Sequence, residues 1–328
     1  MAVAADLSPW RFCVAPMMDW TTSYCRQFHR QLTRRARLYT EMVTTGALLH
    51  GDAPRFLEHA ASEQPLALQL GGSEPDDLAR AAELGGRAGF AEINLNCGCP
   101  SDRVQEGRFG ACLMREPERV AASVQSMRAA TDAVITVKHR VGVDDAEDYP
   151  FMRHFVETVA AAGCEVFIVH ARKAWLQGLS PKENREVPPL TYEHVYRLKQ
   201  DFPALTVVIN GGINSLDECT AHLAHVDGVM LGRAPYERPW LLAEVDGQLF
   251  DDQNPVRHRE EALLAMAPLL DAMAARGEAA NRLTRHVLGL YRGETGGKAF
   301  RRYLSEHGNK PHGRALLQAA LEQVNPRS

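Results

Sequence analysis

The sequence predicts a (β/α)8 barrel followed by a small all-helical domain. Short apolar runs recur eight times over roughly 220 residues with helical patterns between them, which is typical of parallel strands joined by helices. A barrel of this type takes about 250 residues, so the 328-residue chain has room for a second domain. We therefore expect the barrel over residues 1–243 and the helical domain over residues 244–328.

The first apolar run continues into Ala15-Pro16-Met17-Met18-Asp19. A doubly wound sheet, the competing fold, more often carries a glycine-rich dinucleotide-binding turn at this point. The absence of such a turn favours the barrel. The predicted strands are Phe12–Met17, Leu38–Met42, Leu66–Leu70, Ala91–Leu95, Val134–Lys138, Val166–His170, Thr206–Asn210 and Gly228–Leu231.

Signals for helix starts stand between the predicted strands. Residues 73–77 offer a capping serine, an early proline and acidic residues in the first turn, and similar signals occur at 116–118 and 215–218. From about Glu244 onward, alanine, leucine and arginine recur at helical spacing. This spacing predicts helices in segments such as 260–276 and 314–323.

Composition places the chain among cytoplasmic proteins. Its seven cysteines are odd in number and scattered, which indicates reduced thiols and no disulfide framework. No apolar run reaches the roughly 20 residues needed to span a bilayer. Residues 1–10 lack the basic segment and apolar core of a signal peptide. We expect a cytoplasmic monomer without a membrane partner.

The net charge of −4 hides an asymmetry along the chain. Residues 282–328 contain nine Lys or Arg residues and three Glu residues, a balance of +6, which leaves −10 for residues 1–281. A basic region on an acidic body suggests a polyanionic partner. A solvated helical surface is the alternative explanation of the same charges.

Polar and glycine residues stand at the ends of five predicted strands, where a barrel brings its reacting groups together on one face. The two glycine-bearing turns after the last two strands would let backbone N–H groups approach a phosphate, and Arg233 would add a charge. These residues predict a site for FMN. They are Gln69, Lys138, His170, Asn210, Gly211, Gly212, Gly232 and Arg233. Asn94 and Asn96 offer donor and acceptor groups that can read the edge of a planar heterocycle.

The rest of the flavin would lie across the barrel mouth. Lys138 would place an ammonium near N1 and the C2 oxygen of the ring, favouring its reduced form. Gln69 would donate and accept along the pyrimidine edge, and His170 would contact the phosphate or the ring.

Cys99 stands between Gly98 and Pro100, on a turn directly after a predicted strand. Reduction of a carbon–carbon double bond conjugated to a carbonyl needs a hydride at one carbon and a proton at the other. A protonated thiol above a flavin supplies that proton, so we expect Cys99 to act as a general acid. Cys97, Cys99 and Cys112 do not have the spacing of a zinc site, and we expect no metal.

Six motifs, in this order along the chain, resemble those of the tRNA-dihydrouridine synthases. The motifs are Ala15–Thr21, Asn94–Asn96 with Gly98–Ser101, Val137–Arg140, Val169–Arg172, Ile209–Ile213 and Leu231–Ala234. Three further segments resemble the bacterial A-type branch of this family: Tyr39–Met42, Ser101–Gln105 and Arg301–Leu304. The chain departs from the family pattern at Cys97, where another residue type is expected.

The resemblance implies an FMN enzyme that uses NADPH to reduce uridine to 5,6-dihydrouridine in the tRNA D-loop, at positions 20 and 20a for the A-type branch. Hydride would go from reduced FMN to C6, and Cys99 would deliver a proton to C5. Asn96 would contact the uracil. Pro16, Met17, Met18, Gln69, Lys138, His170, Asn210, Gly211, Gly212, Gly232 and Arg233 would hold FMN, and Lys182, Arg185, Arg301 and Arg302 would contact tRNA.

Two other classes of function remain as alternatives. One is an FMN barrel oxidoreductase acting on a small pyrimidine-like molecule, which would not need the basic region after residue 281. The other is a non-catalytic RNA-binding barrel protein, which would need neither Lys138 nor Cys99. The resemblance and the set of strand-end residues both favour the tRNA-modifying enzyme.

Overall fold

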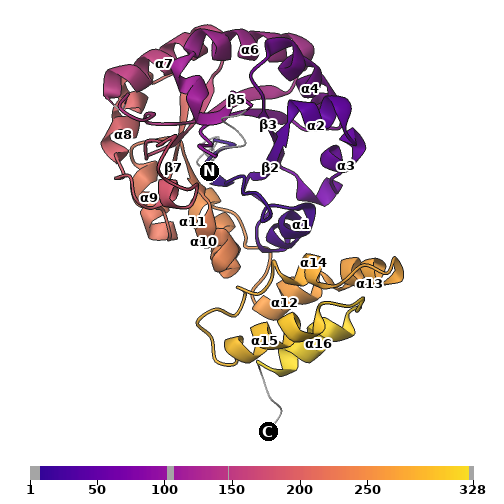
Figure 1. Ribbon diagram of the computed structural model, residues 1–328. Coiled ribbons are helices and arrows are strands. Elements are labelled where there is room, and N and C mark those ends of the chain that lie inside the picture. Colours follow the sequence, from indigo (N-terminus) through magenta and orange to yellow (C-terminus); the bar gives the residue numbers. More distant parts are fainter. Residues whose placement is uncertain (1–7, 102–106, 147, 325–328) are drawn as a thin grey trace, which may run out of the picture.

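The protein, described here from a computed structural model, is a closed barrel of eight parallel strands inside a ring of helices (Figure 1). Residues 8–101, 107–146 and 148–324 are described. This architecture confirms the predicted fold class. The strands are β1 (Phe12–Val14), β2 (Leu38–Thr44), β3 (Leu66–Gly71), β4 (Glu92–Cys97), β5 (Val134–Arg140), β6 (Val166–His170), β7 (Thr206–Asn210) and β8 (Gly228–Leu231).

Seven strand pairs run in the order β1-β8-β7-β6-β5-β4-β3-β2, and a single residue closes the ring. Arg37, just before β2, donates its N–H to the Phe12 carbonyl and accepts from the Val14 N–H, both at 2.9 Å. Because all the strands are parallel, their carboxyl ends meet at one mouth of the barrel. Every strand-end residue singled out in the sequence is thereby carried to the same face.

Three predicted strands, β6, β7 and β8, match the observed bounds. β1 ends three residues earlier than predicted, because Pro16 lacks an N–H for the ladder. β4 and β5 each run two residues farther than predicted, to Cys97 and Arg140. Asn96 and Lys138 therefore lie within strands and are paired with each other across β4 and β5.

Local signals account for most helix starts. α6 begins at Pro117 as predicted, and α9 is capped by Ser215, whose side chain accepts from the Glu218 N–H. α4 differs slightly, since Glu74 and not Ser73 is its N-cap. The barrel's helices are α1 (Ser23–Leu32), α2 (Thr45–His50), α3 (Ala53–Leu57), α4 (Pro75–Arg87), α6 (Pro117–Ala130), α7 (Tyr149–Ala161), α8 (Tyr192–Asp201), α9 (Leu216–Leu223), α10 (Arg233–Glu237) and α11 (Val245–Phe250).

The remaining helices form a separate group that lies beside α1 and α10 (Figure 1). The segment 260–276, which has one helical pattern, is split in two because Pro268 cannot continue a helix begun at Arg259. None of the described helices is long and apolar enough to cross a membrane. This group comprises α12 (Arg259–Leu264), α13 (Ala267–Ala275), α14 (Asn281–Thr284), α15 (Gly297–His307) and α16 (Ala315–Glu322).

A buried carboxylate fastens α11 to the barrel. Asp246 accepts hydrogen bonds from the Thr33 hydroxyl and from the backbone N–H groups of Arg34 and Arg35, in the loop between α1 and β2. That loop leads directly to Arg37, where the barrel closes. The segment just after the predicted domain boundary is therefore hydrogen-bonded to the barrel, while the boundary itself stays a prediction.

We predict that Asp246→Ala lowers the free energy of unfolding by about 3 kcal/mol, because three donors lose a buried, charged acceptor. Urea unfolding followed by circular dichroism measures the change. Asp252→Ala is the matched control, since this exposed carboxylate forms a long ion pair with Arg35, at 3.6 Å, and one solvent-exposed hydrogen bond from the Gln253 N–H. Equal unfolding midpoints for the two variants would contradict the role assigned to Asp246.

Candidate active site

Strand alternation decides which side chains enter the barrel. In β4, Glu92, Asn94 and Asn96 point inward, while Ile93, Leu95 and Cys97 belong to the outer core. In β5 the inward residues are Thr136, Lys138 and Arg140, and His139 packs outside against Phe155 and Phe167. The period of two therefore separates residues that can reach the mouth from residues that only fill the core.

Three buried amides and the Cys99 turn form a connected unit. Gln69 donates to Asn94 at 2.8 Å and accepts from Asn96 at 2.9 Å. The Asn96 side-chain oxygen then accepts from the backbone N–H groups of Gly98 and Cys99, both at 3.0 Å. Gln69, expected to contact a ring with both ends of its amide, already uses each end within the protein. The turn that carries the thiol is thus held by a side chain of the strand before it.

Cys99 is partly exposed, and its thiol lies 3.4 Å from the Ser101 hydroxyl. Cys97, two residues earlier, is fully buried in the outer core, where burial raises its thiol pKa. The second thiol of the motif is therefore kept from solvent and from the mouth. Of the resembling segment 101–105, residues 102–105 lie outside the described residues.

Lys138 and Asn210 meet across the mouth. The ammonium of Lys138 donates to the Asn210 side-chain oxygen at 3.0 Å, and the Asn210 amide donates to the Met230 carbonyl at 2.7 Å. Burial, with the charge of Arg140 nearby, lowers the pKa of Lys138 from 10.5 to about 7. This amine is consequently a cation that loses its proton near neutral pH and that an anionic ligand would stabilise.

His170, at the end of β6, faces the glycine turn after β7. Its ring Nδ1 is buried and has no hydrogen-bond partner, and burial and the neighbouring cations lower its pKa well below the usual value. Gly211 and Gly212 have φ angles of +116° and +74°. A Cβ on Gly211 would come within 3.1 Å of the His170 ring. An unpartnered imidazole beside a turn that tolerates no side chain fits a phosphate-bearing cofactor.

A buried guanidinium ties two loops of the mouth together. Arg140 donates to the carbonyls of Gly98, Lys173 and Asn184, at 2.8, 2.9 and 3.0 Å. Burial lowers its pKa to about 10, so it stays charged at neutral pH. Sequence reasoning placed Arg140 in a motif but gave it no task. The structure shows it between the Cys99 turn and the loop that carries Lys182 and Arg185.

That loop adds further positive charge. Arg185 lies in a short 3-10 helix, η3 (Glu183–Arg185), and its pKa is lowered by partial burial and by nearby Arg233. Arg233, the first residue of α10 after Gly232, pairs with Glu186 at 2.6 Å. Lys182 is exposed at the start of η3. The structure therefore brings Arg185 and Arg233 together with the strand-end residues, as the sequence predicts.

The segment after β1 turns back toward the helical group. The Met17 N–H donates to Thr21, and Met18 is 59% exposed, which is unusual for a large apolar side chain. Asp19 has a φ of +62°, and its carbonyl accepts from Arg285. An exposed methionine next to Pro16 offers an apolar surface at the rim for a planar ring.

Arg301 and Arg302 lie on α15, in the helical group and away from the barrel mouth (Figure 1). Three of the nine basic residues after position 281 are neutralised by ion pairs, with Glu278, Glu237 and Asp271 as partners. Within the described residues, Arg301 and Arg302 form no ion pair. They leave unpaired positive charge on this part of the surface.

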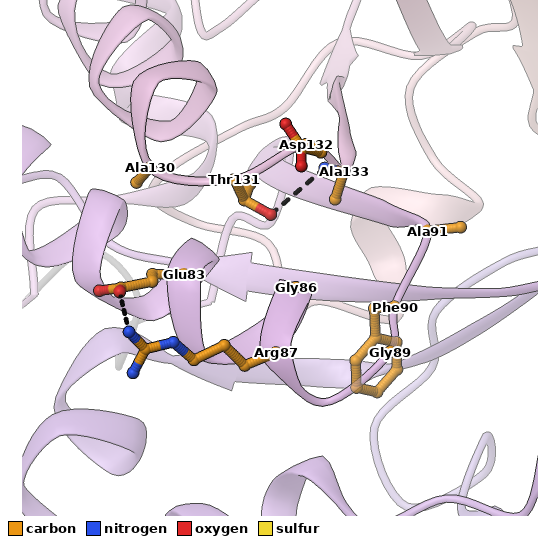
Figure 2. Close-up of a pocket in the computed structure, with 10 residues that line it drawn as sticks. All are labelled: Glu83, Gly86, Arg87, Gly89, Phe90, Ala91, Ala130, Thr131, Asp132 and Ala133. Atoms are coloured by element: carbon orange, nitrogen blue, oxygen red, sulfur yellow. Dashed lines mark hydrogen bonds and ion pairs between the residues drawn. The ribbon is translucent and has the colours of Figure 1, made fainter.

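A hollow of about 550 Å³ lies at the other end of the barrel (Figure 2). It is formed where α4 and α6 end and β4 and β5 begin, and it is lined by residues such as Glu83, Arg87 and Asp132. The parallel strands carry Cys99 to the opposite face. This hollow is therefore separate from the site at the mouth. No three His, Cys, Asp or Glu residues gather as metal ligands within the described part of the chain.

Fold and mouth together show a parallel barrel with buried cationic groups at one opening and a thiol on an adjacent turn. Residues 13–325 match the family described as Dihydrouridine synthase (Dus). The chain therefore belongs to the dihydrouridine synthase family, and the family resemblance drawn from its motifs is confirmed. It is an enzyme of this flavin-dependent family.

Relatives of high identity carry the name tRNA-dihydrouridine(20/20a) synthase. The protein of Pseudomonas putida is 58% identical over 295 residues, which cover 90% of this chain and 88% of the relative. That of Vibrio parahaemolyticus is 54% identical over 316 residues, which cover 96% and 97%.

A solved 2-naphthoyl-CoA reductase has a TM-score of 0.57 at 10% identity. The match covers 72% of this chain and about half of that protein, 50%. This likeness supports the fold alone.

We predict that Lys138 titrates with a midpoint near pH 7 in the ligand-free protein, as a cation below and a neutral amine above. Nuclear magnetic resonance of ¹³Cε-labelled lysine measures this, since the chain has only six lysines. Lys138→Arg is the control and should remove the titrating signal. Six midpoints all above pH 9 would show that the amine is not desolvated.

Proposed function

We propose that this protein is an FMN-dependent tRNA-dihydrouridine synthase that reduces uridine to 5,6-dihydrouridine at positions 20 and 20a, with NADPH as reductant. The carrying observation is the convergence of Cys99, Lys138, His170 and Asn210 at one barrel mouth in a chain of this family. Relatives named for positions 20 and 20a, at 54% and 58% identity, support the assignment of the target.

FMN fits the donor set at the mouth. The glycine turn 211–212, the unpartnered ring nitrogen of His170 and Arg233 would take the phosphate. Lys138 would stand against the anionic edge of the reduced ring, where binding would raise its pKa and keep it protonated. Gln69, Asn210, Gly232 and the segment 16–18 would complete the cradle. When bound, FMN supplies the hydride that C6 of uracil receives.

Cys99 would supply the proton to C5. A general acid must carry its proton at working pH, and the partly exposed thiol stands on the turn nearest the mouth. Asn96, which already holds that turn through its side-chain oxygen, has one N–H left for a uracil oxygen. The protein residues thus orient the base and deliver one proton, while the cofactor accounts for the two electrons.

The uridine of a folded tRNA must leave its stack to reach this mouth. Lys182 and Arg185, beside the mouth, and Arg301 and Arg302, on α15, would contact the RNA backbone. We assign the barrel to residues 1–243 and the tRNA-binding helices to residues 244–328. We propose that the protein acts in the cytoplasm as a monomer.

We predict that Cys99→Ala lowers dihydrouridine formation in unmodified tRNA roughly 10²- to 10⁴-fold, because it removes the proposed donor of the C5 proton. FMN content and NADPH oxidation should persist. Mass spectrometry of tRNA nucleosides measures the product, and Cys112→Ala, which alters the other partly exposed thiol, is the control. Undiminished product from Cys99→Ala would remove the proposed acid.

We predict that the double variant Arg301→Ala with Arg302→Ala weakens tRNA binding about tenfold and lowers the dependence of log K on log salt by about 1.5. The flavin spectrum should not change. Filter binding at several salt concentrations measures both effects. The control removes two exposed, ion-paired arginines of α4, Arg80 and Arg87, and carries the same change in net charge. Equal affinities for both double variants would exclude α15 as a tRNA contact.

A further inference from the structure

A network of buried, hydrogen-bonded side chains runs through the inside of the barrel and ends at the Cys99 turn. It begins at Glu92, whose carboxylate accepts from the Thr136 hydroxyl at 2.7 Å. Thr136 accepts from the Asn94 amide at 2.8 Å, and Asn94 accepts from Gln69 at 2.8 Å. Gln69 accepts from Asn96, which accepts in turn from the N–H groups of Gly98 and Cys99.

The register of the strands aligns the side chains of this network. Gln69, Asn94 and Thr136 are aligned across β3, β4 and β5, so their inward side chains form one row. Glu92 lies one inward position below that row and Asn96 one above it, and the alternation of β4 places all three on one face. The network is therefore a product of the sheet and needs no loop to hold it.

The groups at the two ends of this hydrogen-bond network fix the direction of every hydrogen bond within it. A carboxylate only accepts hydrogen bonds, and a backbone N–H only donates them. Every amide between these ends must point its nitrogen toward Glu92 and its oxygen toward the turn. Glu92, Asn94 and Thr136 are fully buried and Gln69 is 1% exposed, so water cannot replace a lost partner.

Glu92 is itself held from the far side. Arg37 pairs with it at 3.0 Å, and Trp10 and Tyr39 each donate to it at 2.8 Å. These partners are separated from Glu92 by 55, 82 and 53 positions in the sequence. The carboxylate is thus held rigidly, and it fixes the orientation of the other side chains in the network.

We propose that Glu92 is a positioning residue for the proton donor: acting through Thr136, Asn94 and Gln69, it sets the orientation of Asn96 and hence the backbone of the Gly98–Cys99 turn. A consequence is that the Asn96 oxygen, which accepts two N–H groups, is saturated. Asn96 then faces the mouth only as a donor and suits a base edge that carries a carbonyl oxygen. This inference rests on the proposed function only for its catalytic readout.

The experiment interrupts the hydrogen-bond network at Thr136 and leaves the Arg37–Glu92 pair intact. Thr136→Val keeps the shape and removes the hydroxyl, while Thr136→Ser keeps the hydroxyl. Hydrogen exchange, followed by mass spectrometry on a peptide spanning residues 96–101, should speed up roughly tenfold in Thr136→Val and return to the original rate in Thr136→Ser. A peptide over β7 should exchange at the same rate in all three proteins. If Thr136→Val does not fold, Thr136→Cys, whose thiol is a poor hydrogen-bonding group, replaces it.

The catalytic readout separates turnover from binding. In Thr136→Val we expect kcat for dihydrouridine formation to fall roughly tenfold or more while KM for tRNA changes less than about twofold, with recovery in Thr136→Ser. Thr284→Val, a buried threonine in the helical group, is the matched control. Unchanged exchange at residues 96–101, or unchanged kcat, overturns the proposal. An original protein that makes no dihydrouridine, yet shows the expected exchange pattern, overturns the proposed function and leaves the positioning role standing.

Discussion

The closure of the barrel at Arg37 is the contact on which the rest of the molecule depends. Its backbone forms hydrogen bonds with Phe12 and Val14, the first and last residues of β1, and its side chain pairs with Glu92 inside the barrel. Arg37 therefore joins the two open edges of the sheet and also holds Glu92, which lies below the polar row. Asp246 of α11 holds the loop just before Arg37, so this helix supports the same point. Closure of the barrel, anchoring of Glu92 and attachment of α11 are parts of one arrangement.

The inside of the barrel holds both an apolar cluster and a polar network. The apolar cluster comprises Cys13, Ala15, Tyr39, Ala67, Val166, Ile168, Val208 and Met230, most of them from β1, β6, β7 and β8. Glu92, Asn94, Thr136 and Gln69 fill the part formed by β3, β4 and β5. Buried polar groups are costly unless every member is satisfied, and this row satisfies each member in turn. This polar network then supports the Gly98–Cys99 turn, whose position decides where the proposed proton donor lies.

The prediction of the fold from sequence succeeded because the alternation of strands and helices is a local pattern. Parallel topology then carries strand-end residues such as Lys138, His170 and Asn210 to one mouth without further information. Glu92 could not be assigned from sequence, since it stands in an apolar run and its partners lie 44 to 82 positions away. Arg140 was missed for a similar reason: its acceptors are backbone carbonyls of two loops, which leave no trace in residue type.

The positive groups around the mouth have a consequence for how a partner arrives. Residues 1–281 carry a balance of −10, yet Arg140, Arg185 and Arg233 gather at one opening and unpaired basic residues gather on α15. These local groups make the potential around the opening more positive than the net charge of the chain suggests. An anionic partner is attracted to them before any contact forms. Association is then fastest in dilute buffer and slows as added ions shorten the range of the field.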